Sequence, residues 1–228
     1  MSENQSEVVL RNVGLSYGKE KIYENFNAVF PQGVNVILGK SGCGKTTLLN
    51  VIAGLIPYSG ECKTDKVAVV FSEPALAPVS AENNVRMVLK KTDCGVVDEA
   101  LALARIEDKR NQNAATLSDG EKQRVALARA FASKRRVLLL DEPFARLDYG
   151  VKRQLHDTLI NYLQTVASTV VMVTHDVDEA LALADRIYFL DGRPCRLREV
   201  ALLPESQIRR DVFGAEYDDL RKRVLDLF

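Results

Sequence analysis

The chain has 228 residues, of which 46% are hydrophobic and 27% charged, and this composition excludes intrinsic disorder and a small disulfide-built scaffold. Lysine and arginine together number 31, as many as aspartate and glutamate, so the formal net charge is zero. No global field then attracts nucleic acid or an anionic membrane, and an anionic ligand must be bound by a local site.

The cysteines and the start of the chain indicate a cellular compartment. Cys43, Cys62, Cys94 and Cys195 are far apart and form no CxxC pair, which argues against a zinc site or a disulfide framework and favours a reducing cytosol. The first residues are polar and acidic, so no secretory signal is expected, and no apolar run approaches the roughly 18 residues that span a membrane. We expect a cytoplasmic chain that cannot cross a membrane by itself.

The order of apolar runs predicts an α/β domain. Residues 8–28 alternate loosely and are expected to form an antiparallel edge sheet. Four later runs are almost entirely apolar, as expected for central strands of a largely parallel sheet that is covered on both faces. These runs are 34–38, 67–71, 137–140 and 170–174. We expect one domain over residues 1–228.

A phosphate-loop motif follows the first of these runs. Gly39-Lys40-Ser41-Gly42-Cys43-Gly44-Lys45-Thr46 matches GxxxxGK[ST] and leads into a helical stretch, residues 46–53, which a chance glycine-rich turn does not explain. Glycines let backbone N–H groups converge on phosphate oxygens. Lys45 is expected to neutralise phosphate charge, and the Thr46 hydroxyl to bind Mg²⁺. Cys43 is either a thiol with a lowered pKa or, as we favour, an inert packed residue.

The strand signal disappears over residues 73–134, where helical stretches at 81–91 and 97–106 predict an inserted helical subdomain. Within this region Ser118 and Glu121 form an S-x-x-E capping box, which is expected to open a helix over residues 122–131.

The third apolar run ends in two carboxylates, Asp141 and Glu142. Ends of such strands face the ligand crevice of an α/β fold. Asp141 is placed to hold Mg²⁺ and Glu142 to polarise an attacking water. An acidic turn is common after a strand, but the phosphate loop upstream favours the catalytic interpretation.

With Leu117-Ser118-Asp119-Gly120-Glu121-Lys122-Gln123-Arg124, these elements resemble the nucleotide-binding subunit of an ABC transporter over nearly the whole chain. The resemblance implies a P-loop NTPase fold of the ABC ATPase type, ATPase activity, and ATP and Mg²⁺ as cofactors. The intervals that separate Ser118, Asp141 and His175 are usual in that family.

The resemblance also implies a set of ATP-binding residues. These are Tyr17, Gly39, Lys40, Ser41, Gly42, Cys43, Gly44, Lys45, Thr46 and Thr47. Tyr17 matches the aromatic residue that stacks on adenine, with a packed edge-strand tyrosine as the alternative. His175 matches the switch histidine that contacts the γ-phosphate, and it is expected to act in catalysis with Glu142 and Lys45. The expected metal ligands are Thr46, Asp141 and the shorter-reaching Ser72.

A further group of residues is implied to act across a dimer. Ser118, Gly120 and Glu121 match the helix end that points at ATP bound by the other subunit. Asp148 matches an aspartate that links the two sites, and it is also a candidate N-cap for a helix over residues 149–164.

Two positions depart from the family pattern. Ser72 stands where glutamine is usual, with Glu73 beside it, and Asp119 replaces the first glycine of the signature motif. We expect Asp119 to point away from ATP and to cap its own helix, because Ser118 and Gly120 are retained. These departures favour one alternative function, an ATP-binding switch or degenerate subunit with weak hydrolysis.

The resemblance implies a dimer with a second copy or a similar subunit, energising a separate membrane permease from the cytoplasmic face. Stretches 71–78, 175–180 and 190–194 are similar to ATPases of nitrate, sulfonate and taurine importers, which implies a small anionic or organic solute and, indirectly, an extracytoplasmic solute-binding protein. Candidate permease contacts are Ala75, Leu76, Pro78 and Val79.

Two rival functions explain less of the sequence. A soluble ABC ATPase of DNA repair or translation usually has fused ATPase domains or a long coiled coil, and neither is apparent here. A small-molecule kinase leaves the downstream motifs unexplained. At the C-terminus, Tyr217, Leu220, Val224 and Leu227 recur at helical spacing and predict an amphipathic helix in residues 205–228, which is either regulatory or, as we favour, packed on the sheet domain.

Overall fold

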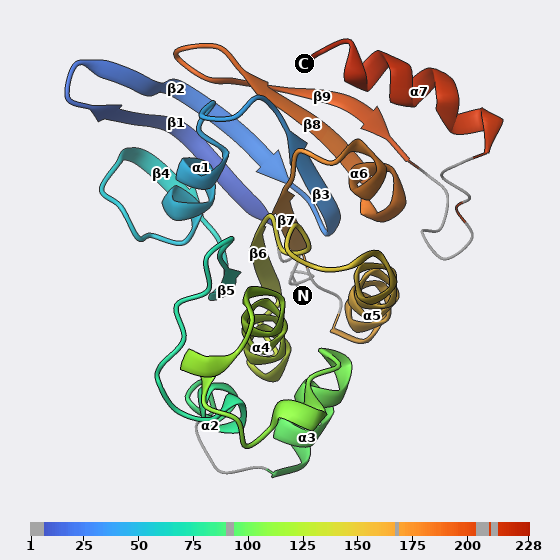
Figure 1. Ribbon diagram of the computed structural model, residues 1–228. Helices are drawn as coiled ribbons and strands as arrows, with labels where there is room; N and C mark the ends of the chain where they lie inside the picture. The colour runs from blue at the N-terminus through green and yellow to red at the C-terminus, as the bar shows by residue number, and fades with distance from the viewer. Residues whose placement is uncertain (1–6, 90–93, 167–168, 204–209, 211–213) are drawn as a thin grey trace, which may run out of the picture.

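The computed structural model describes residues 7–89, 94–166, 169–203, 210 and 214–228. Its strands form two sheets, an antiparallel one in the order β2-β1-β4 and a six-stranded one in the order β5-β6-β7-β3-β8-β9 (Figure 1). In the larger sheet only the β8–β9 pair is antiparallel. The predicted α/β fold, with its antiparallel edge sheet and helical insertion, is confirmed.

The strands are β1 (Val8–Tyr17), β2 (Glu20–Phe30), β3 (Gly33–Leu38), β4 (Ser59–Lys63), β5 (Val67–Val70), β6 (Val137–Asp141), β7 (Thr169–Val173), β8 (Arg186–Asp191) and β9 (Arg196–Leu202). The helices are α1 (Lys45–Ile52), α2 (Ala81–Arg86), α3 (Cys94–Leu103), α4 (Asp119–Ala132), α5 (Tyr149–Val166), α6 (Val177–Leu183) and α7 (Ala215–Leu225), with short 3₁₀ turns at Glu107–Lys109 and Ala114–Thr116. None of the helices within the described ranges is long and apolar enough to cross a lipid bilayer.

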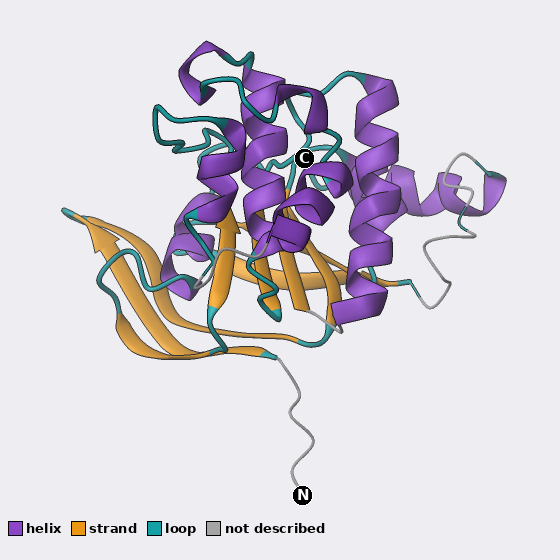
Figure 2. Ribbon diagram, turned by 90° about the horizontal axis from the view of Figure 1, so that it is seen from below, coloured by secondary structure: helices purple, strands orange, loops and turns teal. Residues whose placement is uncertain are grey.

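The larger sheet is covered on both faces, which explains its unbroken apolar runs. On β6, Leu138 and Leu140 pack into the cluster formed with α4, α5 and α6, while Val137 and Leu139 pack toward α1 and the antiparallel sheet. Figure 2 shows most of the helices gathered on one side of the strands. Burying one such aliphatic side chain stabilises the fold by roughly 1.5–3 kcal/mol, so this sheet is a rigid support for whatever its strand ends carry.

One predicted central strand lies at an edge. Among the described strands β5 pairs with β6 alone, and its first three residues are only partly buried. Its apolar character has another cause, because Ala68 packs on the helix-side cluster and Val69 on the opposite one. Burial against neighbouring layers, rather than strand pairing on both sides, accounts for this run.

The helical insertion lies below the sheets in Figure 1 and is formed by α2, α3 and α4. The predicted helix at 81–91 ends at Arg86, where residues 87 and 88 form a turn, and its last two residues lie outside the described ones. The helix predicted at 97–106 begins and ends three residues earlier. Buried Val85, Leu101 and Val125 join the insertion to the helix-side core of the sheet.

The C-terminal amphipathic helix is confirmed as α7, although residues 205–209 and 211–213 of the predicted tail lie outside the described ones. Tyr217 and Val224 are buried on its inner face, which packs on α6. The Phe228 ring stands edge-on to Phe189 of β8, with centroids 5.3 Å apart. In the described part the tail packs on the sheet domain, as favoured above.

Candidate functional site

The candidate site lies where three adjacent parallel strands end. Strands β6, β7 and β3 are neighbours in the sheet, and their C-terminal ends lead into Asp141–Glu142, Thr174–His175 and the glycine-rich loop. The loops after these ends surround a cavity of about 580 Å³. The cavity is lined by ten of the predicted residues: Tyr17, Ser41, Gly42, Gly44, Lys45, Thr46, Thr47, Asp141, Glu142 and His175.

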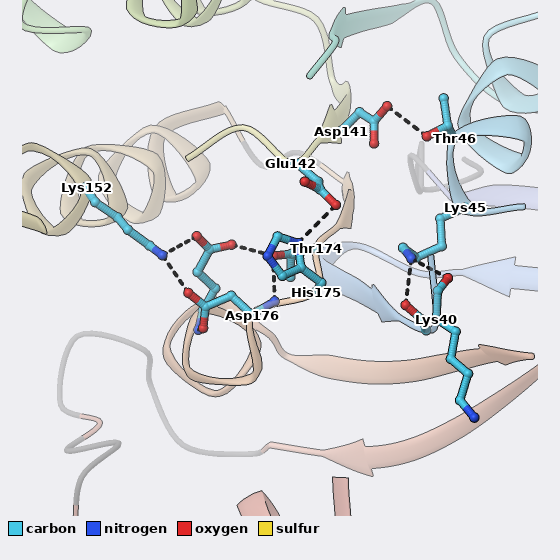
Figure 3. Close-up of polar contacts among 11 residues, drawn as sticks. Lys40, Lys45, Thr46, Asp141, Glu142, Lys152, Thr174, His175 and Asp176 are labelled. Carbon is cyan, nitrogen blue, oxygen red and sulfur yellow. Dashed lines mark hydrogen bonds and ion pairs between the residues drawn. The ribbon is translucent and has the colours of Figure 1, made fainter. Parts of the chain in front are cut away.

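The glycine-rich loop needs its glycines for backbone reasons. Gly39, Gly42 and Gly44 have φ values of +156°, +74° and +105°. A Cβ on Gly39 would stand 2.3 Å from the Leu190 carbonyl oxygen, so a side chain there would displace backbone. The Lys45 ammonium group donates to the carbonyls of Gly39 at 2.6 Å and Lys40 at 3.0 Å (Figure 3). A cation and the N-terminus of α1 therefore meet at one end of the cavity, which suits an anion.

Two side chains with oxygen atoms that could bind a metal face each other beside this loop. The Thr46 hydroxyl donates to Asp141 Oδ2 at 3.0 Å, and burial raises the pKa of the Asp141 carboxyl, opposed by this hydrogen bond (Figure 3). A hydroxyl and a carboxylate are ligands that Mg²⁺ prefers, and Mg²⁺ usually takes only one or two protein groups beside substrate phosphates. The described residues contain no cluster of three or more His, Cys, Asp or Glu that could hold a metal alone.

A carboxylate–imidazole pair lies across from the loop. His175 Nδ1 is 3.1 Å from Glu142 Oε1, and both side chains line the cavity. Glu142 has a φ of +45°, a left-handed conformation that costs a non-glycine residue roughly 1–3 kcal/mol and is typical of functional sites. Its N–H donates to the Val173 carbonyl of β7 at 2.9 Å, which fixes the strained turn to the sheet.

A charged network behind His175 was not predicted from the sequence. Lys152 Nζ lies 2.6 Å from both Asp176 Oδ2 and Glu179 Oε1, and the Thr174 hydroxyl donates to Glu179 at 2.7 Å. Burial raises the pKa of Glu179, whose exposure is only 3%, although these hydrogen bonds oppose the shift. Figure 3 shows Lys152 reaching from α5 to the loop that carries His175. The network fixes that loop to the body of the domain.

The signature-motif residues lie elsewhere. The capping box is confirmed, because Ser118 Oγ accepts from the Glu121 N–H at 3.3 Å and Glu121 Oε2 accepts from the Ser118 N–H at 2.8 Å. Asp148 Oδ1 accepts from the Val151 N–H at 3.0 Å, as predicted for the N-cap of α5. Ser118, Gly120, Glu121 and Asp148 do not line the cavity of their own chain, and neither does Ser72.

The prediction that Asp119 caps its own helix is wrong. Ser118 provides the cap, and Asp119 is the first residue of α4. Its carboxylate instead lies 3.5 Å from Lys122 Nζ and 3.6 Å from Arg146 Nη1. A second contact of Arg146 reaches Glu73, the neighbour of Ser72, at 3.4 Å, so one guanidinium lies between the carboxylates of Asp119 and Glu73.

The cavity also contains residues that the sequence did not single out. Glu20, Ile22 and Arg193 complete its lining, the last from the turn after β8. The only signal at Arg193 was its place in the stretch 190–194. Tyr17 is 54% exposed at the cavity, so it is not a packed tyrosine, and Cys43 is buried as favoured.

Comparisons with known proteins identify the family and the relatives of the chain. A family model described as ABC transporter matches residues 23–145. The chain is 41% identical to "Aliphatic sulfonates import ATP-binding protein SsuB 2" of Pseudomonas syringae pv. syringae (strain B728a), over 98% of this chain and 82% of the relative. It is 36% identical to "Nitrate import ATP-binding protein NrtD" of Synechococcus elongatus (strain ATCC 33912 / PCC 7942 / FACHB-805), over 89% and 83% of the two chains.

Solved structures give the same fold. A dimeric ATP-binding cassette in a post-hydrolysis state, bound to ADP and Pi, matches with a TM-score of 0.76 and 27% identity, over 86% of this chain and 100% of that one. An inward-facing transporter of putative metal-chelate type matches with a TM-score of 0.74 at 24% identity, over 94% and 87% of the two chains, which shows the fold alone.

Proposed function

This chain belongs to the ABC transporter family, and we propose that it hydrolyses ATP between two subunits to drive a separate membrane permease that imports a small oxyanion. One observation supports the proposal most directly. The glycine-rich loop, the Thr46–Asp141 pair and the Glu142–His175 pair surround one cavity at the ends of three adjacent strands.

ATP binding in the proposed complex uses both ends of the cavity. The triphosphate lies on the N–H groups of the glycine-rich loop and the N-terminus of α1, and Lys45 exchanges its contacts with the Gly39 and Lys40 carbonyls for phosphate oxygens. Tyr17 offers an exposed ring for stacking on adenine. Thr46 and Asp141 are the residues that would hold Mg²⁺, whose charge neutralises the phosphates when it is bound.

Glu142 and His175 are assigned to the hydrolytic step. Water attacks the γ-phosphorus, the bond to the ADP oxygen breaks, and Glu142 accepts the proton of the water. His175 is hydrogen-bonded to Glu142, and we assign it to holding that carboxylate and to contacting the γ-phosphate. The strained backbone at Glu142 keeps its carboxylate at the cavity.

A second copy completes the site. Ser118, Gly120, Glu121 and Asp148 lie outside the cavity of their own chain, and the capped N-terminus of α4 is a suitable anion-binding end. We assign these residues to ATP bound by the partner copy. The dimeric solved relative supports this arrangement.

The proposed solute class and the proposed cellular location of the subunit are inferred from the names of the similar proteins. Those reported above are named for import of sulfonates and nitrate, which are small oxyanions. The proposed subunit therefore works at the cytoplasmic face, against the permease, and an extracytoplasmic binding protein supplies the solute. The loop with Ala75, Leu76, Pro78 and Val79, next to α2, is the proposed permease contact.

The test is ATP hydrolysis by the purified chain with Mg²⁺, beside Glu142→Gln and the matched control Glu199→Gln. Glu199 is an exposed carboxylate on β9, paired with Arg186 away from the cavity. We expect Glu142→Gln to lose at least 100-fold in turnover and to form an ATP-dependent dimer, as loss of a general base predicts, and Glu199→Gln to match the parent. ATP binding by the parent without turnover or dimerisation would favour the degenerate-subunit alternative.

A further inference from the structure

The outer side of the glycine-rich loop is held by three side chains that come from other parts of the chain. The carbonyls of three consecutive loop residues each accept a hydrogen bond. The Gly42 carbonyl accepts from Arg193 Nη2, the Cys43 carbonyl from the Cys195 thiol at 2.8 Å, and the Gly44 carbonyl from the Tyr23 hydroxyl at 2.7 Å.

These contacts bear on how the loop presents its N–H groups. A phosphate-binding loop works because successive N–H groups point into one concavity. A peptide plane whose carbonyl is held on the outside must direct the N–H of the next residue toward the opposite side. Fixing the carbonyls of Cys43 and Gly44 therefore fixes the N–H groups of Gly44 and Lys45, the N-cap and the first residue of α1. The Gly42 carbonyl belongs to the peptide whose N–H, that of Cys43, donates to the Lys40 carbonyl at 3.2 Å and closes the turn of the loop.

Two of the three donors are buried and closely packed. Tyr23 and Cys195 are 2% and 3% exposed, and a Cβ on Gly44 would lie 3.2 Å from the thiol sulfur and from the phenol oxygen. Burial raises the pKa of the Tyr23 phenol and of the Cys195 thiol, so both keep the proton that they donate.

Arg193 is the donor that the nucleotide cavity can reach. It lines the cavity from the turn between β8 and β9. Its Nε donates to Glu20 at 2.8 Å and its Nη1 to the Cys195 sulfur at 3.0 Å. The guanidinium thus contacts Glu20 at the start of β2, the Cys195 sulfur and the loop at once through three separate nitrogens, whereas a lysine ammonium has its donors on one nitrogen.

We propose that Arg193, assisted by Cys195 and Tyr23, is a positioning residue for ATP, holding the carbonyl side of the glycine-rich loop so that its N–H side fits the β- and γ-phosphates. This inference rests on the proposed function, because it concerns the same site. It assigns the β8–β9 turn to phosphate recognition, and Arg193 takes no part in the chemical step.

The main experiment compares Arg193→Met with Arg198→Met. Arg198 lies on the same hairpin, is 57% exposed and pairs with Asp191, outside the cavity. Dissociation constants for ATP, ADP and AMP are measured by calorimetry, and the melting temperature is measured without nucleotide. We expect Arg193→Met to weaken ATP and ADP about five- to tenfold and AMP less than twofold, because AMP has no β- or γ-phosphate. Arg198→Met should match the parent.

A second pair of variants, at Cys195, tests the same inference if Arg193→Met fails to fold. Cys195→Ser keeps a donor toward the Cys43 carbonyl, whereas Cys195→Ala removes it, and both are smaller than the parent residue. We expect the alanine variant to bind ATP at least twofold more weakly than the serine variant, with AMP affinity equal in the two.

The outcomes separate the two proposals. A parent chain that binds ATP no better than AMP would refute the proposed function and this inference with it. A parent chain that prefers ATP, with the same ATP-to-AMP preference in Arg193→Met and in Cys195→Ala, would overturn this inference alone. A lowered melting temperature with that preference unchanged would identify Arg193 as merely structural and would also overturn it.

Discussion

Removal of the Lys152 ammonium group tests how the loop that carries His175 is held. Lys152 pairs with Asp176 and Glu179 at 2.6 Å each, and Glu179 is almost fully buried. Lys152→Met keeps the side-chain length and removes the charge, which leaves Glu179 with the Thr174 hydroxyl as its remaining hydrogen-bond donor in this network.

The size of the stability loss in Lys152→Met depends on how deeply the ion pairs are buried. Breaking a fully buried ion pair by removing one partner costs about 3–5 kcal/mol. Here the Lys152 side chain is 21% exposed and that of Asp176 35%, so water screens part of the interaction. We expect Lys152→Met to lower the free energy of unfolding by about 2–3 kcal/mol at pH 7.5, between the surface and buried limits.

The pH dependence has a definite sign. Burial raises the pKa of Glu179 in the folded state, and loss of the Lys152 cation must raise it further. A folded-state pKa above the unfolded value, about 4.3, means that the native state takes up the proton first as the pH falls. The loss in the free energy of unfolding caused by Lys152→Met is therefore complete above the Glu179 pKa of the folded variant. This loss shrinks as the pH falls below that pKa.

The assay is urea unfolding at pH 7.5 and 5.5. Lys134→Met is the control, because Lys134 is 58% exposed and only 3.8 Å from Glu99, and it should change stability by less than about 0.5 kcal/mol. The double variant Lys152→Met with Glu179→Gln should recover at least half of the loss. A loss below about 0.5 kcal/mol for Lys152→Met at pH 7.5, or a loss that is larger at pH 5.5 than at pH 7.5, would refute this account.

Two further predictions concern ATP. Tyr17→Ala should weaken ATP binding by about 1–3 kcal/mol while Tyr17→Phe retains it, measured with a fluorescent ATP analogue; equal affinity of the two variants would remove the stacking role. Arg146→Ala should change the free energy of unfolding by less than about 1 kcal/mol, because its pairs are exposed, yet weaken ATP-driven dimerisation of Glu142→Gln chains by leaving Asp119 without its guanidinium partner. Adding Asp119→Gly should restore dimerisation in sedimentation, and no recovery would show that Arg146 acts in another way.

The sequence predicted those parts of the fold and site that depend on local order. Strands β3, β6 and β7 are apolar on both faces and lead directly into polar motifs, so their identity and the site at their ends follow from neighbouring residues. The capping box of Ser118 and Glu121 is equally local. Such features are encoded within about ten residues of chain.

Features that depend on distant partners were not predictable. The residues of β4 and β9 are mostly polar or exposed, so no hydrophobic pattern indicates their pairing. The Asp119 carboxylate pairs with Arg146 of the loop before α5, a contact that the sequence around Ser118 does not encode. Arg193 meets Gly42 across 151 positions of sequence, a contact that no local pattern encodes.

The contacts of Arg146 connect Asp119, one departure from the family pattern, with Glu73, the residue next to the other departure, Ser72. Glu73 and Asp119 lie far apart in sequence, and each adds a carboxylate, but Arg146 lies within 3.4 Å of one and 3.6 Å of the other. Lys122 also lies beside Asp119, so the positive charges of Lys122 and Arg146 offset the negative charges of Asp119 and Glu73 locally. The loop after β5, the start of α4 and the loop before α5 are thereby joined. Because the first adjoins the proposed permease contact and the other two the proposed dimer contact, we expect a substitution of Glu73 to alter the pairing of Arg146 with Asp119.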